Sequence, residues 1–202
     1  EYGTLWADDL DAEAVDLIKT SIGSVVFTSH TGNIEVTKFN PTGTALIYST
    51  YLGGGDVEAP HSLVHDSQDN LILLGTSSSA DFPTIGGAYD QIFNGGWAGT
   101  YANMWGYQYS NGVDIILSKF DVSGALTAST FIGGSDNEGL NESMVYNYSD
   151  QVRGEVVLDD NDDVYVCTSI WSDDFPVTNG SAINNGAGWG TQDAVVFKIE
   201  SH

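Results

Sequence analysis

The chain has 202 residues, with 28 acidic and 5 basic side chains and a formal net charge of −23. This charge repels nucleic-acid phosphates and anionic lipid surfaces, so we expect no nucleic-acid partner and no binding to a membrane surface. No stretch approaches the roughly 20 apolar residues that a membrane-spanning helix needs, which argues against direct membrane insertion. Clusters of glycine between short apolar runs predict an all-β fold.

The first 39 residues form a short β unit by pattern. Apolar runs predict strands near residues 3–6, 14–19, 24–28 and 34–38. The turn at residues 31–33 joins the last two strands as a tight hairpin. Residues 9–19 also fit a helical period, so a short helix is the alternative there. The chain begins at Glu1 without methionine, which we interpret as a mature or excised piece.

A repeat begins at residue 39. Residues 39–56, FNPTGTALIYSTYLGGGD, return at residues 120–136 as FDVSGALTASTFIGGSD. In repeat proteins each copy is a supersecondary unit that buries its apolar face against its neighbours. The chain is therefore predicted to consist of stacked β units.

A lysine closes an alternating apolar strand in each unit. Lys38, Lys119 and Lys198 account for three of the five basic residues, and each follows an aspartate or asparagine by five positions. We expect each lysine to lean across its unit to an acid of the same or the next repeat, such as the aspartate of an Asp-Phe-Pro block. Such a pair would offset charge and set the strand register.

The Asp-Phe-Pro block is the third shared feature. Residues 69–84, DNLILLGTSSSADFPT, match residues 162–178, DDVYVCTSIWSDDFPVT. Phe82 and Phe175 are predicted to plug the gap between units, and Pro83 and Pro176 to end the strand.

These motifs together resemble the SBBP-type β-propeller repeat family over roughly residues 34–199. The resemblance implies one domain, 1–202, of four-stranded antiparallel units near residues 1–39, 40–120 and 121–199. It also implies an exported, extracellular or cell-surface protein, of the kind often carried by type IX secretion.

Three units are too few to close a propeller, which usually has four to eight. The sequence also stops directly after the third lysine strand, at residues 199–202. We therefore expect part of a larger assembly, or one completed by a partner. Its open sheet edges would be covered by further β-repeats of the same chain or by neighbouring subunits.

An aromatic loop at residues 93–112 lies inside the long insertion between two strands. Its rings alternate with glycine and asparagine, a combination that sugars and protein partners exploit. In the alternative interpretation, which we prefer, the rings fold back as a small satellite core. The candidate ligand-binding residues are Trp97, Tyr101, Trp105, Tyr107 and Tyr109.

Calcium is the only cofactor that the sequence suggests, and it does so weakly. Two glycine turns each carry a pair of carboxylates, Asp56 with Glu58 and Asp136 with Glu138. The acidic segment 159–163 lacks the glycine and distal glutamate of an EF-hand, and we interpret it as a turn. The main prediction is therefore no cofactor.

Catalytic signatures are missing from the sequence. It has no nucleophile elbow and no phosphate-binding glycine loop with a lysine. His61 and His65 lie four residues apart on a predicted strand, about 13 Å, which is too far to share a metal ion. Cys167 lies in an apolar run and is predicted to be a small buried side chain. We therefore predict no enzyme.

The sequence favours a non-catalytic scaffold and binding module, secreted or at the cell surface, that acts in adhesion or surface assembly. One alternative is a subunit that polymerises through open sheet edges into a surface filament or sheath. The other is a glycan-binding or carbohydrate-active domain that uses the aromatic loop at residues 93–112.

Overall fold

The computed structural model describes residues 13–18, 24–28, 32–101, 107–141, 154–178 and 192–201, with only the backbone at 13–18, 24–28, 99–101 and 107–108. Every regular element in these residues is a β-strand, so the prediction of an all-β fold is confirmed. None of the described residues forms a helix long and apolar enough to cross a bilayer. The helix considered for residues 9–19 is wrong, because β1 (Glu13–Ile18) is a strand hydrogen-bonded to β2 (Ser24–Thr28).

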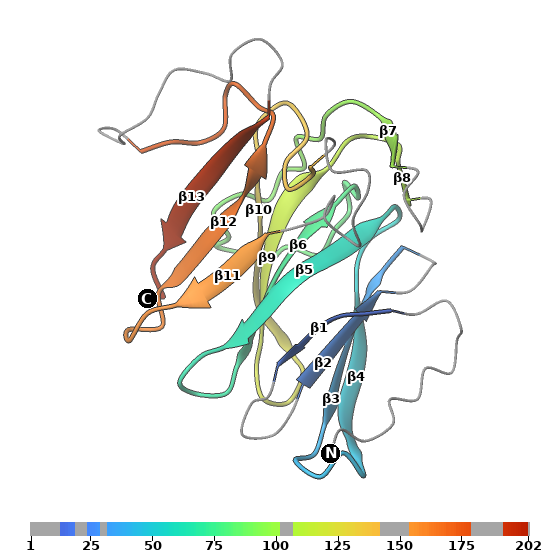
Figure 1. Ribbon diagram of the computed structural model, residues 1–202, viewed down its shortest axis with the longest axis vertical. Coiled ribbons are helices and arrows are strands. Elements are labelled where there is room, and N and C mark those ends of the chain that lie inside the picture. Colours follow the sequence, from blue (N-terminus) through green and yellow to red (C-terminus); the bar gives the residue numbers. More distant parts are fainter. Residues whose placement is uncertain are drawn as a thin grey trace.

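Three antiparallel sheets lie side by side (Figure 1). The first sheet consists of β1, β2, β3 (Ile34–Phe39) and β4 (Leu46–Leu52). The second consists of β5 (Glu58–His65), β6 (Leu71–Ser77), β9 (Asp114–Phe120) and β10 (Leu126–Ile132). The third consists of β11 (Glu155–Leu158), β12 (Val164–Ile170) and β13 (Asp193–Ile199). A separate hairpin is formed by β7 (Gly99–Tyr101) and β8 (Tyr107–Tyr109).

Each complete sheet takes its fourth strand from the sequence unit that follows it. By sequence β4 belongs to the unit 40–120, yet it pairs with β3, with Lys38 opposite Tyr48 and Ile34 opposite Leu52. The second sheet repeats this arrangement, since β10 pairs with β9 in the corresponding register. The sheets are thus offset from the sequence units by one strand, and each fourth strand leads directly into the next sheet.

Two apolar clusters fill the spaces between the sheets. The first contains Ile34, Val36 and Leu52 of the first sheet and Leu63, Leu71, Leu73, Phe82, Ile116, Phe120 and Phe131 from the second. The second contains Ile72, Leu74, Ile115, Leu117 and Ile132 of the second sheet and Val156, Val164, Val166 and Phe175 from the third. The middle sheet is therefore buried on both faces, because alternate residues of its strands point to opposite neighbours.

In the described part of the chain, the third sheet lacks a fourth strand beside β13, and one of its faces is uncovered. No described strand pairs with the outer side of β13, whereas β3 and β9 are each covered there by a fourth strand. The prediction that Cys167 is buried is wrong, because its side chain is exposed. Val164 and Val166 of the same strand point to the second sheet, and Cys167 points the other way.

Candidate functional site

The described residues with the most distinctive chemistry lie where one sheet passes into the next. We call these places the joints. The first joint consists of residues 53–58 and 77–83, and the second of residues 133–138 and 170–176. Both combine a glycine turn, a buried glutamate and an Asp-Phe-Pro block, so the same structure is built twice.

In the first joint, the Asp-Phe-Pro block holds the glycine turn in place. The Gly55 N–H donates to Oδ1 of Asp81 at 2.8 Å, and the Asp56 N–H donates to Oγ of Ser79 at 2.8 Å. These bonds connect the end of the first sheet to the second sheet.

The second joint has the same bonds at the corresponding positions. The Ser135 N–H donates to Oδ1 of Asp174 at 2.8 Å, and the Asp136 N–H donates to Oγ of Ser172 at 2.8 Å. The aspartate of each Asp-Phe-Pro block therefore has a defined task, which is to fix the turn that precedes its sheet.

The expectation that the repeated lysines pair with an acid of the same repeat is confirmed for Lys119 and Lys198, but these acids are not the aspartates of the Asp-Phe-Pro blocks. Lys119 Nζ lies 2.8 Å from Oδ2 of Asp66, and Lys198 Nζ lies 2.6 Å from Oδ2 of Asp163. Both acids belong to the turn between the first two strands of the same sheet. Lys38 is buried, and its Nζ lies 5.8 Å from the centre of the Tyr48 ring, while burial lowers its pKa.

The acidic segment 159–163 is a turn, as interpreted from the sequence. Oδ1 of Asp159 accepts from the N–H groups of Asn161 and Asp163, at 2.9 and 3.1 Å. Asp66 closes the equivalent turn of the second sheet through Gln68 and Asn70. In both segments an aspartate side chain accepts hydrogen bonds from the backbone of its own turn. These bonds explain the shape of the turn without a bound ion.

The glutamates of the joints are fully buried. Ser77 Oγ donates to Oε1 of Glu58 at 2.7 Å, and the Gly54 N–H donates to Oε2 at 3.2 Å. Ser172 Oγ and the Gly134 N–H bond Glu138 in the same way. Burial raises the pKa of both carboxyls, that of Glu138 to about 8.

A second buried acid, Asp114, lies beside Glu138 and was not among the sequence candidates. Its oxygens accept from the N–H groups of Asn94, at 2.7 Å, and Gly95, at 3.2 Å, and its carboxyl lies against Gly133 together with that of Glu138. Burial raises the pKa of Asp114 to about 7. Because both pKa values lie near or above 7, the two carboxyls are partly protonated at neutral pH.

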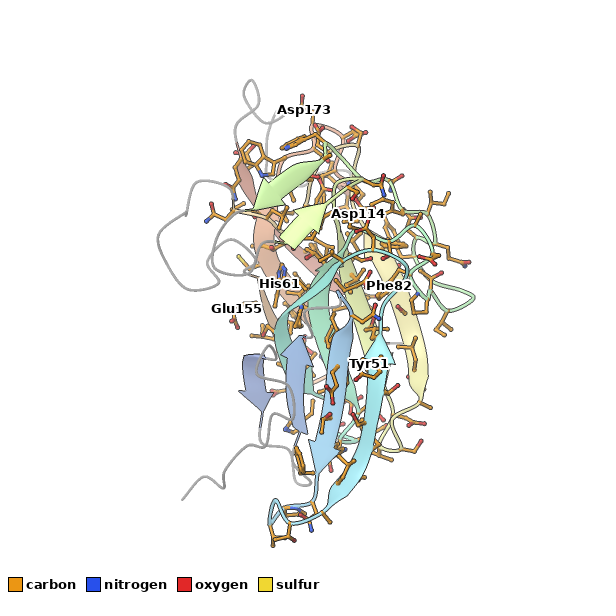
Figure 2. All side chains as sticks on the ribbon, turned by 90° about the vertical axis from the view of Figure 1, so that its right-hand side faces the viewer. Tyr51, His61, Phe82, Asp114, Glu155 and Asp173 are labelled. Carbon is orange, nitrogen blue, oxygen red and sulfur yellow. The ribbon has the colours of Figure 1, made fainter. Side chains whose placement is uncertain are left out.

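Close packing explains why a glycine precedes each buried glutamate by five positions. A Cβ at Gly133 would lie 2.6 Å from Oδ1 of Asp114, closer than any side chain allows. The first joint has Asn33 at the position of Asp114, also packed against its glycine, Gly53. Asp114 could have been found from the sequence, because an Asn or Asp opens every lysine strand. Asp114 lies at the end of the sheets that carries β7 and β8 (Figure 2).

The weak calcium candidates do not gather into a cation site. Glu58 and Glu138 already accept from protein donors, and Asp56 accepts from Nδ2 of Asn111 at 3.3 Å. Asp136 has a raised pKa because of partial burial and the charges of Asp174 and Asp173. Across the described residues, no three His, Cys, Asp or Glu side chains are arranged to hold a metal ion.

The aromatic loop divides between packing and exposure. Tyr109 is buried in a small cluster with Val113 and Leu140, which matches the satellite-core interpretation. Trp97 is 39% exposed, and its ring stands edge to face on Trp171 at 5.4 Å. Trp105 and the side chains of Tyr101 and Tyr107 lie outside the described residues.

His61 and His65 lie on β5, and neither approaches a metal-binding arrangement. His61 is buried, with Nε2 3.3 Å from Oγ1 of Thr76, and burial lowers its pKa to about 3. His65 lies near the surface, with Nδ1 3.0 Å from the carbonyl oxygen of Asp66. Both histidines therefore support the second sheet.

Comparisons with protein-family models and with curated proteins each found no match. The resemblance to SBBP repeats therefore rests on the motifs in the sequence.

The bonds of the second joint predict different effects for two neighbouring aspartates. Asp174→Ala removes the acceptor of the Ser135 N–H and should lower the free energy of unfolding by about 1 kcal/mol. Asp173→Ala makes the same change of charge one residue earlier, where the described structure has no side-chain hydrogen bond, and should have little effect. Urea unfolding followed by tryptophan fluorescence measures both. Equal losses would contradict the proposed role of Asp174.

Proposed function

We propose that this chain is a non-catalytic β-repeat scaffold of propeller type, which acts outside the cell in adhesion or surface assembly. One observation carries the proposal. The same joint is built between the first and second sheets and again between the second and third, while the two outermost sheets keep the matching faces uncovered in the described structure. A module of this kind is suited to taking up further β-repeats.

The outer face of the third sheet supports this proposal position by position. Val196 holds the place in its lysine strand that Val36 holds in the first sheet and Leu117 in the second. Val36 is 0% and Leu117 8% exposed, because each is covered by the next sheet, whereas Val196 is 71% exposed. Val157 and Cys167 lie exposed on the same face. Glu155 and Lys198 share this face, and its exposed apolar side chains are of the kind that interfaces bury.

The outer face of the first sheet offers the opposite half of a joint. Tyr51, labelled on β4 in Figure 2, holds the place of Phe131 in the second sheet. Phe131 is 0% exposed because it packs against the first sheet, whereas Tyr51 is 67% exposed. The molecule therefore presents one half of a joint at each side.

The net charge and the resemblance support an extracellular location. A charge of −23 keeps a protein soluble, and its self-repulsion is screened within about 8 Å at physiological ionic strength. The resemblance to SBBP repeats points to exported proteins.

Light scattering over a concentration series tests the scaffold proposal. We expect the 202-residue chain to associate as its concentration rises, more strongly in 0.5 M than in 0.05 M NaCl, because salt screens the repulsion between acidic copies. A chain that keeps the mass of one copy, 21.5 kDa, at every concentration and salt level would contradict assembly through the outer sheets.

Glycan binding is the second candidate, and the half-exposed Trp97 against Trp171 favours it. An exposed indole face beside acidic and amide groups can stack on a sugar ring. A glycan array with the wild type, Trp97→Ala and Trp105→Ala tests this. Binding that Trp97→Ala abolishes would support it, and an array without signal for the wild type would remove it.

A further inference from the structure

We propose that the outer edge of β13 binds an extended segment of another β-repeat polypeptide as the fourth strand of the third sheet. The segment has the pattern that β4 and β10 share, in which a Ser-Thr pair is followed by an aromatic residue, an aliphatic residue and two glycines. In the described part of this chain both copies of the pattern are already in use, because β4 pairs with β3 and β10 with β9. This inference rests on the proposed function and names the partner segment, its register and its preferred residues.

The three lysine strands hold the same place in their sheets but have different neighbours. β3 pairs with β2 and β4, and β9 pairs with β6 and β10. β13 pairs with β12, and no described strand lies on its other side (Figure 1). An edge strand presents a row of unpaired N–H and C=O groups, to which an extended peptide can add. The edge of β13 is therefore the place where a strand can be taken up.

The burial of β13 shows that its edge is open as well as its outer face. Val195, Phe197 and Ile199 pack toward the second sheet but are only half-buried. The residues at the same positions of β9 are all buried, namely Ile116, Ser118 and Phe120. Both sets of side chains face a neighbouring sheet, and β9 is flanked in addition by β10. A fourth strand beside β13 would supply the missing cover.

The register of the added segment follows from the pairs that the chain already makes. Thr130 of β10 lies opposite Leu117, and β4 pairs with β3 in the same register. Val196 holds the position of Leu117 in β13. The threonine of the segment therefore lies opposite Val196, and the aromatic residue that follows it lies opposite Val195.

The aromatic residue of the segment enters the space between the second and third sheets. Phe131 of β10 fills the equivalent space of the first joint, where it is fully buried and its ring centre lies 5.6 Å from that of Phe82. Phe175 holds the position of Phe82 in the second joint, and its ring centre lies 6.2 Å from that of Phe197. We therefore expect the added ring to pack beside Phe175 and to be the main anchor, as buried aromatic residues are in interfaces.

The serine of the pattern fits β13 less well than it fits the other two lysine strands. In the first two sheets it makes a hydrogen bond across the strands, with Ser49 Oγ 2.9 Å from Thr37 Oγ1 and Ser129 Oγ 3.0 Å from Ser118 Oγ. Phe197 holds the position of Thr37 and Ser118 in β13 and offers no hydroxyl group. A serine placed beside it would lose its partner. The edge of β13 should therefore prefer alanine at this position.

A synthetic peptide with the sequence of residues 121–136, DVSGALTASTFIGGSD, tests the strand addition because it carries the pattern of β10. Its binding to the 202-residue chain is measured by fluorescence anisotropy of the labelled peptide, in about 0.5 M NaCl to screen charge repulsion. We expect saturable binding. The absence of saturable binding up to about 1 mM peptide would overturn the proposal.

Three changes in the peptide test which of its side chains make contact. Phe131→Ser should weaken binding at least about tenfold, because it removes the anchor. Ile132→Ser is the matched control, because this residue points to the uncovered face of the third sheet, and it should change binding less than about threefold. Ser129→Ala should strengthen binding about threefold or more. Equal losses for the first two peptides would overturn the assigned orientation, and weaker binding of the third would overturn the preference for alanine.

Disulfide trapping tests the register. The chain carries Val196→Cys and Cys167→Ser, which both change exposed side chains. A peptide with Thr130→Cys places its thiol directly opposite, at the Cβ separation of about 5 Å of cross-strand pairs, and should form a disulfide with the chain. A peptide with Leu126→Cys carries its thiol about 13 Å further along the strand and should form little. Equal yields from the two peptides would overturn the register.

The peptide experiment and the light-scattering experiment can fail separately. If the chain associates with itself but binds no peptide, strand addition is wrong and the scaffold proposal stands. If the peptide binds in the assigned register but the chain keeps the mass of one copy, strand addition stands and assembly of copies through the outer sheets is wrong. Failure of both experiments would overturn both proposals.

Discussion

Replacing Phe82 with alanine is expected to lower the free energy of unfolding by about 3 to 5 kcal/mol, the usual cost of emptying a buried aromatic site. The Phe82 ring is buried between the first and second sheets, and its centre lies 5.6 Å from that of Phe131. Its loss would open a cavity at a place where two sheets meet. Because β-sheets are stiff, the cavity should collapse only in part, which places the loss in the upper half of that range.

Urea unfolding measures this effect, with Tyr89→Ala as the control for loss of an exposed aromatic ring. Tyr89→Ala should change the free energy of unfolding by less than about 0.5 kcal/mol. Phe175→Ala empties the same site in the second joint and should cost about as much as Phe82→Ala, since Phe175 is similarly buried. A loss below about 1 kcal/mol for Phe82→Ala would mean that the ring does not hold the sheets together.

The strands could be predicted from the sequence because the signal for them is local. Apolar runs between turn clusters located β2 and β3 within a residue of their observed ends. Sheet membership could not be predicted in the same way. The sequence repeat places residues 46–52 in the second unit, but their hydrogen bonds go to β3 of the first. A repeat boundary in sequence does not state which neighbour a strand pairs with.

Long-range partners were the weakest part of the sequence interpretation. The lysines were recognised as a repeated feature, but Lys119 pairs with Asp66 and not with Asp81. With 28 acids in the chain, the sequence cannot select one partner. The prediction that Cys167 is buried was wrong for a related reason. An apolar run predicts a strand but does not say whether both faces of that strand are covered.

The sequence also did not identify the neighbours of the buried acids in the joints. Glu138 was noted for its proximity to Asp136 in sequence, which suggested a calcium site. In the fold its carboxyl meets Asp114, which lies 24 positions earlier in the chain. The repeated positions of Asn33, Asp114 and Asp193 carried the information, but only the sheet packing shows that the first two face a buried glutamate.

This packing makes stability depend on pH in a direction that can be worked out. In the unfolded chain Asp114 titrates near its ordinary pKa of 3.8, whereas burial raises its pKa to about 7 in the folded chain. Between these values the folded chain binds more protons than the unfolded chain. Stability therefore falls as the pH rises from about 4 to about 8. The difference between the two pKa values corresponds to about 4 kcal/mol.

Asp114→Asn should remove this cost, because asparagine is neutral and is already present at the same position of the first joint as Asn33. Its Oδ1 can accept from the Asn94 N–H, and its Nδ2 can donate to Glu138. We expect the variant to match the wild type at pH 4 and to exceed its free energy of unfolding by up to about 4 kcal/mol at pH 8.

Urea unfolding at pH 4, 6 and 8 measures this difference, with Asp193→Asn as the control. Asp193 opens the third lysine strand but is exposed, so its replacement should change stability by less than about 0.5 kcal/mol at each pH. His61 acts in the opposite direction, because its pKa of about 3 makes protonation below pH 6.5 favour the unfolded chain. That effect is common to all three proteins and cancels in the comparison. If Asp114→Asn is less stable than the wild type at pH 8, the ionised carboxylate stabilises the joint and the buried pair does not share a proton there.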